Sequence, residues 1–125
     1  MACGSGPARH RAVGDYGERV AARHLEALGM TVVDRNWRCD QGEIDLVLRD
    51  GRDLVVCEVK TRRSRAFGEP VEAITRAKLS RLRRLAGCWA SAHDHPGSRL
   101  RIDVVGLLGH PDGTYTVTHL EGVGG

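Results

Sequence analysis

The sequence predicts a mixed α/β fold, also describable as α+β, in which helices flank a single sheet of parallel and antiparallel strands. One helical pattern precedes three strand-like segments, and a second helical pattern precedes two more. The central strand-like segments are apolar on both sides, which suits a sheet covered on both faces. With 125 residues, of which 41% are hydrophobic, the chain is long enough for one compact domain with a single core.

Local patterns define the elements in chain order. Residues 1–13 are rich in Gly, Ala, Ser and Pro, so we expect a flexible leader, followed by a single domain over residues 14–121. A first helix is predicted over residues 15–28, with Asp15 as its N-cap. The expected apolar stripe of this helix contains Tyr16, Val20, Ala21, Leu25 and Leu28. A first strand is predicted over residues 30–38.

Residues 42–62 predict a β-hairpin with its turn at Asp50-Gly51, because both residues tolerate the positive backbone angles that hairpin turns need. Side-chain alternation places Glu43 and Asp45 on one face of the first hairpin strand. The other face of that strand is expected to carry Ile44, Leu46 and Leu48.

The length of the hairpin loop decides whether the acidic groups of its two strands meet. In the second strand, Glu58 and Lys60 share a face that is otherwise apolar. A loop of two residues after Arg49 sets Glu43 opposite Glu58, whereas a loop of four sets Asp45 opposite Glu58. A loop of three would place the carboxylates on opposite faces of the hairpin.

Two carboxylates placed opposite each other need a compensating charge. At about 5 Å apart they repel by roughly 3 kcal/mol at an effective dielectric near 20. A divalent cation would compensate them, and Mg²⁺ or Mn²⁺ suits hard oxygen ligands. The peptide carbonyl of Val59 is a further candidate ligand.

Asp45, followed after twelve residues by Glu58-Val59-Lys60, has the spacing of a metal-dependent phosphodiester-cleaving site. In such a site two acidic groups hold an ion that polarises the phosphate and lowers the pKa of a bound water. An ammonium on the same strand face can reach that water or the developing charge. A cross-strand salt bridge of Glu58 and Lys60 at a sheet end is the alternative interpretation.

Lysine usage and the first helix add two candidates. Only two of the 19 basic residues are lysines, Lys60 and Lys78, and both occupy positions where apolar residues are expected. Because an ammonium has a more adjustable pKa than a guanidinium, this choice suggests a chemical constraint. Glu18 lies within about 60° of the buried side of the first helix. It is either a first-turn carboxylate favoured by the helix dipole or a member of the acidic cluster.

Basic residues that could contact phosphates follow the hairpin. We expect a basic loop over residues 61–69 and a second helix over residues 70–92, beginning at Pro70. The candidates for nucleic-acid binding are Arg62, Arg63, Arg65, Lys78, Arg81 and Arg84. A solvated basic surface is the alternative interpretation of the helix. Two further strands are predicted over residues 100–108, interrupted by Asp103, and over residues 114–120.

The composition says more about the cellular compartment of the protein than about its binding partner. A net charge of +3 permits an anionic partner without requiring one. The four cysteines lack the spacing of a zinc site, so we expect free thiols in a reducing cytoplasm. No apolar run approaches the roughly 20 residues needed to cross a bilayer, so no membrane association is expected.

Four motifs resemble those of the bacterial YraN family of uncharacterised proteins. The motifs are Gly-Asp-x-Gly-Glu with Ala-x-x-x-Leu at 14–25, Gly-Glu-Ile-Asp-Leu-Val at 42–47, Glu-Val-Lys-Thr-Arg at 58–62 and Arg-Ile-Asp-Val-Val at 101–105. That family is similar to the PD-(D/E)xK nuclease superfamily and, distantly, to archaeal Holliday-junction resolvases. The resemblance implies a restriction-endonuclease-like core of order αβββαβ.

The resemblance also implies roles for individual residues. Asp45 takes the first acidic position, Glu58 and Lys60 form the second motif, and Glu18 supplies a carboxylate from the first helix. Ile44 stands where the superfamily has the proline that names its first motif, a change that the superfamily tolerates. The expected catalytic residues are thus Asp45, Glu58, Lys60 and Glu18, and the expected metal ligands are Asp45, Glu58 and Glu43.

The leading hypothesis is a cytoplasmic Mg²⁺- or Mn²⁺-dependent endonuclease acting on DNA, with branched or otherwise structured DNA among the candidate substrates. One alternative is a nucleic-acid-binding module that keeps the nuclease fold without turnover, and another is a protein-interaction domain. A symmetric homodimer would suit cleavage of two strands, although the sequence reveals no interface.

Overall fold

The computed structural model describes residues 11–95 and 99–124. Within them one sheet has the strand order β1-β2-β3-β4-β5. Its strands are β1 (Thr31–Cys39), β2 (Gly42–Asp50), β3 (Asp53–Arg62), β4 (Arg99–Gly109) and β5 (Tyr115–Leu120). The helices are α1 (Arg11–Ala27) and α2 (Arg76–Ala92). The pair β3–β4 is parallel and the other three pairs are antiparallel, which confirms the predicted single mixed sheet and the α+β class.

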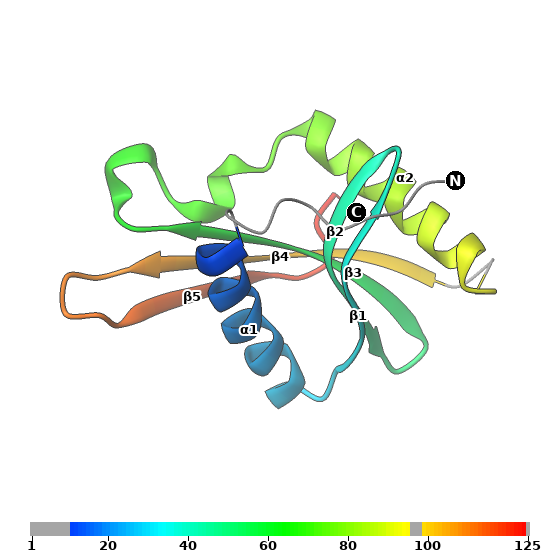
Figure 1. Ribbon diagram of the computed structural model, residues 1–125, viewed down its shortest axis with the longest axis horizontal. Helices are drawn as coiled ribbons and strands as arrows, with labels where there is room; N and C mark the ends of the chain where they lie inside the picture. Colours follow the sequence, from blue (N-terminus) through cyan, green and yellow to red (C-terminus); the bar gives the residue numbers. More distant parts are fainter. Residues whose placement is uncertain (1–10, 96–98, 125) are drawn as a thin grey trace.

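The two helices cover opposite faces of a strongly twisted sheet. In Figure 1, β4 and β5 run across the view while β1 and β2 cross them steeply. The cluster beneath α1 contains Ala21, Ala22, Leu25, Met30, Leu46, Leu48, Val55, Cys57, Val105 and Leu107. The cluster beneath α2 contains Ile44, Val47, Leu54, Val56, Leu82, Leu85, Ala86, Trp89, Ala90 and Ile102. Burial on both sides explains why β3 and β4 are apolar on both faces.

The β2–β3 hairpin has the even-numbered register that allows its carboxylates to share a face. Arg49 pairs with Leu54 and Asp50 pairs with Asp53, so the turn consists of Gly51 and Arg52 rather than Asp50 and Gly51. Gly51 has a φ of +60°, which an L side chain adopts only at a cost. Four residues separate Arg49 from Leu54, as one of the two predicted even registers requires.

One predicted face assignment is wrong. Ile44 packs in the cluster beneath α2, whereas Leu46 packs in the cluster beneath α1, so the two residues do not share a face. Asn36 of β1 has a φ of +50° and lies between the β1 residues that pair with Ile44 and Leu46. This left-handed residue twists the strand pair locally, and simple alternation fails there.

The helix boundaries also differ from the predicted ones. The helix α1 begins at Arg11 rather than at Asp15, so residues 11–13 of the predicted leader belong to it, while residues 1–10 lie outside the described residues. The predicted second helix is broken in two, because Ile74 and Thr75 are extended between a short 3-10 helix at Pro70–Ala73 and α2. The Thr75 hydroxyl caps α2 by accepting a hydrogen bond from the Lys78 backbone N–H at 3.1 Å.

In the described part of the chain, neither helix has the length and apolar character required to cross a lipid bilayer.

The predicted basic loop contains another short 3-10 helix, Arg65–Phe67, which begins after Ser64. The predicted strands over 100–108 and 114–120 correspond to β4 and β5 with boundaries shifted by one residue.

Candidate functional site

The carboxylate of Asp45 occupies the point at which the β2–β3 ladder ends. The last backbone pair of this ladder is Leu46 with Cys57, and continuation of the register would place Asp45 opposite Glu58. Instead, the Oδ2 atom of Asp45 accepts a hydrogen bond from the Val59 backbone N–H at 2.8 Å. The side chain thus satisfies a backbone donor that a strand partner would otherwise satisfy, and it is fixed beside Glu58.

The surroundings of Asp45 raise its pKa well above the ordinary value. Burial is the largest cause and the negative charge of Glu58 the second, with smaller contributions from Glu18 and Glu43. The hydrogen bond from Val59 opposes the rise without cancelling it. The fold therefore brings Glu18, Glu43 and Glu58 within electrostatic range of Asp45.

The residues that could hold a metal here are Asp45 and Glu58. Among the residues that the structure describes, no group of three or more His, Cys, Asp or Glu side chains is arranged to hold an ion. Mg²⁺ is commonly bound through one or two carboxylates, with water and substrate phosphate completing its octahedron. Two hard carboxylates that repel each other fit this mode of binding, but they do not form a closed cage of protein ligands.

Two ammonium groups converge on Glu58. The Nζ atoms of Lys60 and Lys78 lie 3.3 and 4.0 Å from the same Oε2 atom of Glu58. The predicted alternative of a salt bridge between Glu58 and Lys60 is therefore present, along one strand rather than across two. Lys78 reaches this carboxylate from the first turn of α2, which explains why a lysine interrupts the apolar side of that helix.

The two lysines differ in how firmly they hold their protons. Burial alone would lower the pKa of Lys60, but the neighbouring Lys78, which gives up its proton first, and the charges of Glu58 and Asp45 raise it overall. The pKa of Lys78 is lowered, first by the adjacent Lys60 and then by burial. At neutral pH Lys60 is therefore a fixed positive charge, and Lys78 is the group more easily deprotonated.

The arginines that are predicted to bind phosphate lie at separate positions in the structure. Arg62 ends β3, and its buried Nε has no hydrogen-bond partner among the described residues, while Arg63 is exposed beside it. The Nε of Arg65 lies 2.6 Å from Oε1 of Glu69, so this guanidinium is partly engaged. Arg81 and Arg84 are exposed on α2, with Arg81 near enough to help lower the pKa of Lys78.

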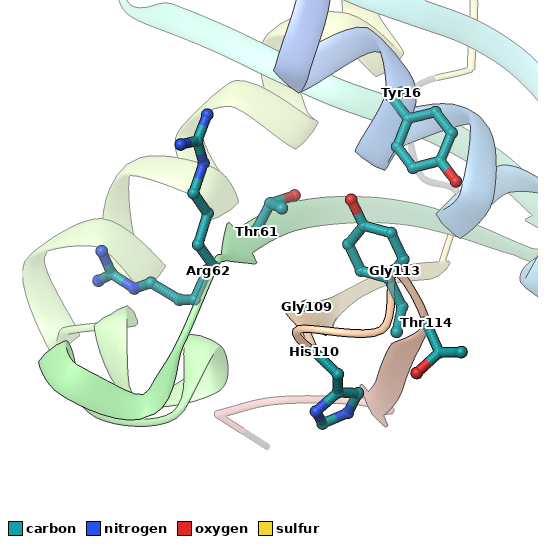
Figure 2. A pocket seen from close by; sticks show the side chains of 9 residues that line it. Tyr16, Thr61, Arg62, Gly109, His110, Gly113 and Thr114 are labelled. Carbon is teal, nitrogen blue, oxygen red and sulfur yellow. The ribbon is translucent and has the colours of Figure 1, made fainter.

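A cavity beyond the end of β3 was not predicted. It has a volume of about 460 Å³ and is lined by residues of α1, the end of β3 and the β4–β5 turn. Figure 2 shows Thr61 and Arg62 on one side of it and Gly109, His110 and Thr114 on the other, with Tyr16 above. Tyr16 is 45% exposed and Leu28 is 58% exposed, so neither belongs to the buried stripe predicted for α1.

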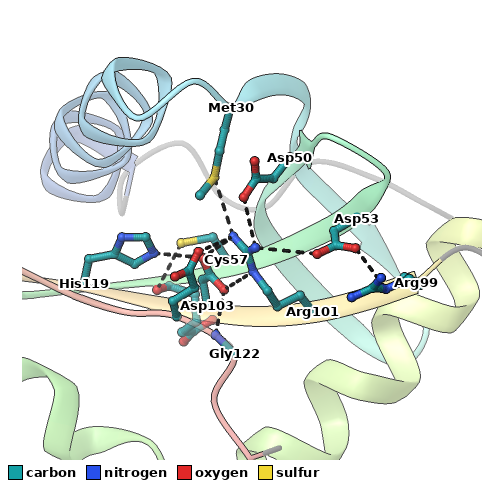
Figure 3. Close-up of polar contacts among 11 residues, drawn as sticks. Met30, Asp50, Asp53, Cys57, Arg99, Arg101, Asp103, His119 and Gly122 are labelled. Carbon is teal, nitrogen blue, oxygen red and sulfur yellow. Dashed lines mark hydrogen bonds and ion pairs between the residues drawn. The ribbon is translucent and has the colours of Figure 1, made fainter.

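Asp103, predicted only as an interruption in a strand, is the centre of a buried polar network (Figure 3). Its carboxylate accepts hydrogen bonds from Arg101 Nε at 3.0 Å and from the Gly122 backbone N–H at 3.1 Å. His119 Nε2 lies 2.8 Å from its Oδ2 atom. Arg101 also contacts Asp50 at 3.0 Å, which ties the hairpin turn to β4. The role that these contacts indicate is structural.

Comparison with known proteins matches this chain to proteins without an assigned activity. The family model described as "Uncharacterised protein family UPF0102" matches residues 17–107. A UPF0102 protein of Beutenbergia cavernae is 60% identical over 90% of this chain and 96% of its own length. UPF0102 proteins of Kineococcus radiotolerans and of a Nocardioides species are 59% and 50% identical over 90% and 99% of this chain, and over 93% and 100% of their own lengths.

Proposed function

The chain belongs to the uncharacterised protein family UPF0102, as its resemblance to YraN proteins predicts, and from that premise we propose that it is a Mg²⁺- or Mn²⁺-dependent endonuclease acting on DNA. The observation that supports this most is the position of Asp45, held by the Val59 N–H beside Glu58 where the β2–β3 ladder ends. The raised pKa of Asp45 shows that its ionised form is unfavourable there, and a divalent cation would relieve this cost.

In the proposed reaction, each residue has a role that its environment supports. Asp45 and Glu58 would hold a divalent ion, which would supply Lewis acidity at the scissile phosphate and make a bound water more acidic. Lys60, whose pKa is raised, serves as a fixed charge that stabilises the negative charge developing on the phosphate and orients the attacking water. Glu18 and Glu43 adjust the local potential and orient water, and Lys78 contacts the DNA backbone near Glu58.

The basic residues beyond this centre are proposed to hold the DNA. Arg62 and Arg63 follow Lys60 on β3 and its loop, and Arg81 and Arg84 extend the positive surface along α2. Arg65 contributes less than the sequence suggests, because it is paired with Glu69. Contacts of this kind with phosphates bind many sequences and weaken as salt rises.

Cleavage assays test the enzymatic proposal. Flapped, four-way and single-stranded DNA are incubated with the protein and Mg²⁺ or Mn²⁺, and we expect Asp45→Asn and Lys60→Ala to lose cleavage by at least about 100-fold. Arg99→Ala is the matched control, since Arg99 is exposed on β4 and pairs with Asp53 at the other end of the parallel ladder. Wild-type protein no more active than Lys60→Ala on all three substrates would contradict catalysis.

A second candidate function is a nucleic-acid-binding module without turnover. The contact of both Lys60 and Lys78 with one oxygen of Glu58 favours it, because these ammonium groups compensate the carboxylate without a metal. Calorimetric titration with Mn²⁺ distinguishes the two functions. Heat of binding that disappears in Asp45→Asn supports the nuclease, whereas DNA affinity without such metal binding supports the module.

The cellular setting and the assembly state belong to the same proposal. Cys39, Cys57 and Cys88 are free thiols, which supports a reducing compartment such as the cytoplasm. A symmetric homodimer would place two sites on the two strands of a duplex. Sedimentation of the protein with and without a four-way DNA junction tests that arrangement.

A further inference from the structure

The cavity beyond β3 combines aromatic and basic groups from distant parts of the chain. Tyr16 comes from α1 and Tyr115 from the start of β5, and their ring centroids are 5.6 Å apart at an interplanar angle of 43°. Both rings are partly exposed, Tyr16 by 45% and Tyr115 by 37%. They therefore present accessible aromatic surface beside a cavity of about 460 Å³, a size within the usual range of ligand sites.

The polar lining of the same cavity suits a phosphate. Arg62 and Arg63 lie on its β3 side, and the lining residues within the described part of the chain include no acid. Arg63 is exposed, so its guanidinium is accessible to a phosphate, whereas the Nε of Arg62 is buried. Guanidinium groups also bind phosphate oxygens in pairs, which fixes the orientation of the phosphate.

The nearest acid on the β4–β5 turn is already engaged. Asp112 accepts hydrogen bonds from the Thr114 backbone N–H at 3.0 Å and from the Thr114 hydroxyl at 2.7 Å. His110 is likewise held, with its Nε2 atom 2.6 Å from the Thr116 hydroxyl. These contacts order the turn that forms the far wall of the cavity, so the wall is in place before a ligand arrives.

The cavity lies close to the carboxylate site along the chain. Thr61 and Arg62 directly follow Lys60 on β3, and successive strand residues advance about 3.3 Å. Their side chains alternate, so Lys60 points to the α2 side of the sheet and Thr61, which meets Gly17 of α1, points to the other. A DNA strand crossing the end of β3 would thus meet both places in succession.

We propose that this cavity binds one unpaired nucleotide of the DNA strand next to the scissile phosphate, with its base against Tyr16 and Tyr115 and its phosphate at the exposed Arg63, which follows β3. This inference rests on the proposed action on DNA and extends it. It assigns the enzyme to DNA with locally unpaired positions, such as bulges, flaps and junctions. Stacking tolerates every base, so selection is by pairing state rather than by sequence.

Fluorescence anisotropy tests the site without requiring catalysis. A labelled duplex with one unpaired thymidine is compared with the same duplex fully paired, in EDTA, so that cleavage plays no part. Wild type should bind the bulged duplex at least about 5-fold more tightly, and Tyr115→Ala should weaken that binding by about 5- to 150-fold while leaving the paired duplex unchanged. Tyr115→Phe should keep the preference, because the ring remains.

Two further arms keep the test decisive. Tyr16→Ala, in α1, should also weaken binding of the bulged duplex. Leu120→Ala removes a 39% exposed side chain from the same strand as Tyr115 and should leave binding of the bulged duplex unchanged. Free thymidine 5′-monophosphate should compete only at far higher concentration than the bulged DNA. Equal competition would assign the cavity to free nucleotides and overturn the proposal.

The outcomes separate this inference from the proposed nuclease activity. Cleavage with equal affinity for bulged and paired duplexes would refute the nucleotide site and leave the nuclease standing. A bulge preference that depends on Tyr115, in a protein that never cleaves, would support the site and refute the nuclease. Absence of binding to either duplex in EDTA would refute the nucleotide site, and the cleavage assay with metal would then decide the nuclease by itself.

Discussion

Asp45 and Val59 are joined across the end of a broken strand ladder, with the carboxylate Oδ2 2.8 Å from the backbone nitrogen. This contact fixes an acidic group that the rest of its surroundings disfavour, since burial and Glu58 both raise its pKa. Functional sites often contain an ionisable side chain whose pKa is strongly shifted by its surroundings. Such a group commonly lowers the folding stability of the protein while it serves the reaction.

Asp45→Asn should stabilise the protein when no metal is present. The amide keeps an acceptor for the Val59 N–H but removes the repulsion from Glu58, so we expect the free energy of unfolding at pH 7 to rise by about 1 kcal/mol or more. Urea denaturation measures it. Excess Mn²⁺ should then stabilise wild type, by roughly 3 kcal/mol at one hundred times its Kd, but not the variant.

The matched control for this prediction is Asp50→Asn, in the same strand. Asp50 contacts Arg101 at 3.0 Å, so its loss should slightly destabilise the protein, by about 1 kcal/mol or less, with no change in the response to Mn²⁺. An equal gain of stability in both variants would show that the loss of any one negative charge, rather than the Asp45 site, is responsible.

Stability should fall as pH rises through the raised pKa of Asp45. The folded pKa of this group exceeds its unfolded value, so between the two values the folded state binds more protons than the unfolded state. The contribution of Asp45 to stability is therefore full below the unfolded pKa and is lost above the folded pKa. Unfolding measured from pH 4 to pH 8 should show a weaker decline for Asp45→Asn than for wild type, and parallel curves would contradict the assignment.

Asp103→Asn should destabilise the fold without altering the carboxylate site directly. Asp103 is fully buried and is contacted by Arg101, His119 and Gly122, so removing its charge leaves buried donors poorly satisfied. We expect a loss of about 3 kcal/mol in the free energy of unfolding. Glu121→Gln is the control, because Glu121 is 59% exposed and its contact with Arg101 is worth about 1 kcal/mol or less.

Gly17→Ala should destabilise α1 packing even though alanine favours helices. A Cβ at position 17 would lie 2.5 Å from the Thr61 hydroxyl oxygen, which forces α1 away from β3. We expect a cost of about 1–3 kcal/mol and a loss of any cleavage that depends on Glu18, the next residue. Thermal unfolding and the DNA cleavage assay measure the two effects.

Two variants serve as controls for Gly17→Ala. Gly87→Ala in α2 meets nothing within 4 Å and should gain about 0.5–1 kcal/mol from helix propensity. Thr61→Ala removes the clashing oxygen, so the double variant should recover most of the stability that Gly17→Ala loses. Additive losses in the double variant would place the strain elsewhere.

Much of this arrangement follows from local sequence patterns. Alternating side chains and an even-numbered hairpin loop are sufficient to place Asp45 and Glu58 together, and the structure has the register in which Leu54 pairs with Arg49. Such predictions succeed because strand alternation and helix periodicity are set by backbone geometry. Lys78, which occupies a position where an apolar residue is expected, lies 4.0 Å from Glu58, a contact that the sequence pattern does not predict.

Other features depend on contacts that no local pattern encodes. The face of Ile44 follows from a left-handed Asn36 in the neighbouring strand. The break at Ile74 and Thr75 separates two helical turns that the sequence pattern joins. The cavity beyond β3 requires Tyr16 and Tyr115 to meet, which depends on the pairing of β5 with β4 and on the packing of α1 over the sheet.

The strand β3 pairs with β2 over fewer residues than with β4, and this difference affects how its last residues are supported. Pairing with β2 stops at Cys57, whereas pairing with β4 continues to Arg62. The same strand is therefore interior at its start and an edge at its end, and Glu58 and Lys60 lie on the edge portion. There the substrate of the proposed enzyme could approach from the open side, while β4 supplies the backbone pairing that keeps Glu58 and Lys60 aligned. Changes in β4 opposite Lys60, at Gly106, should therefore reduce the proposed cleavage through lost alignment before they reduce DNA binding.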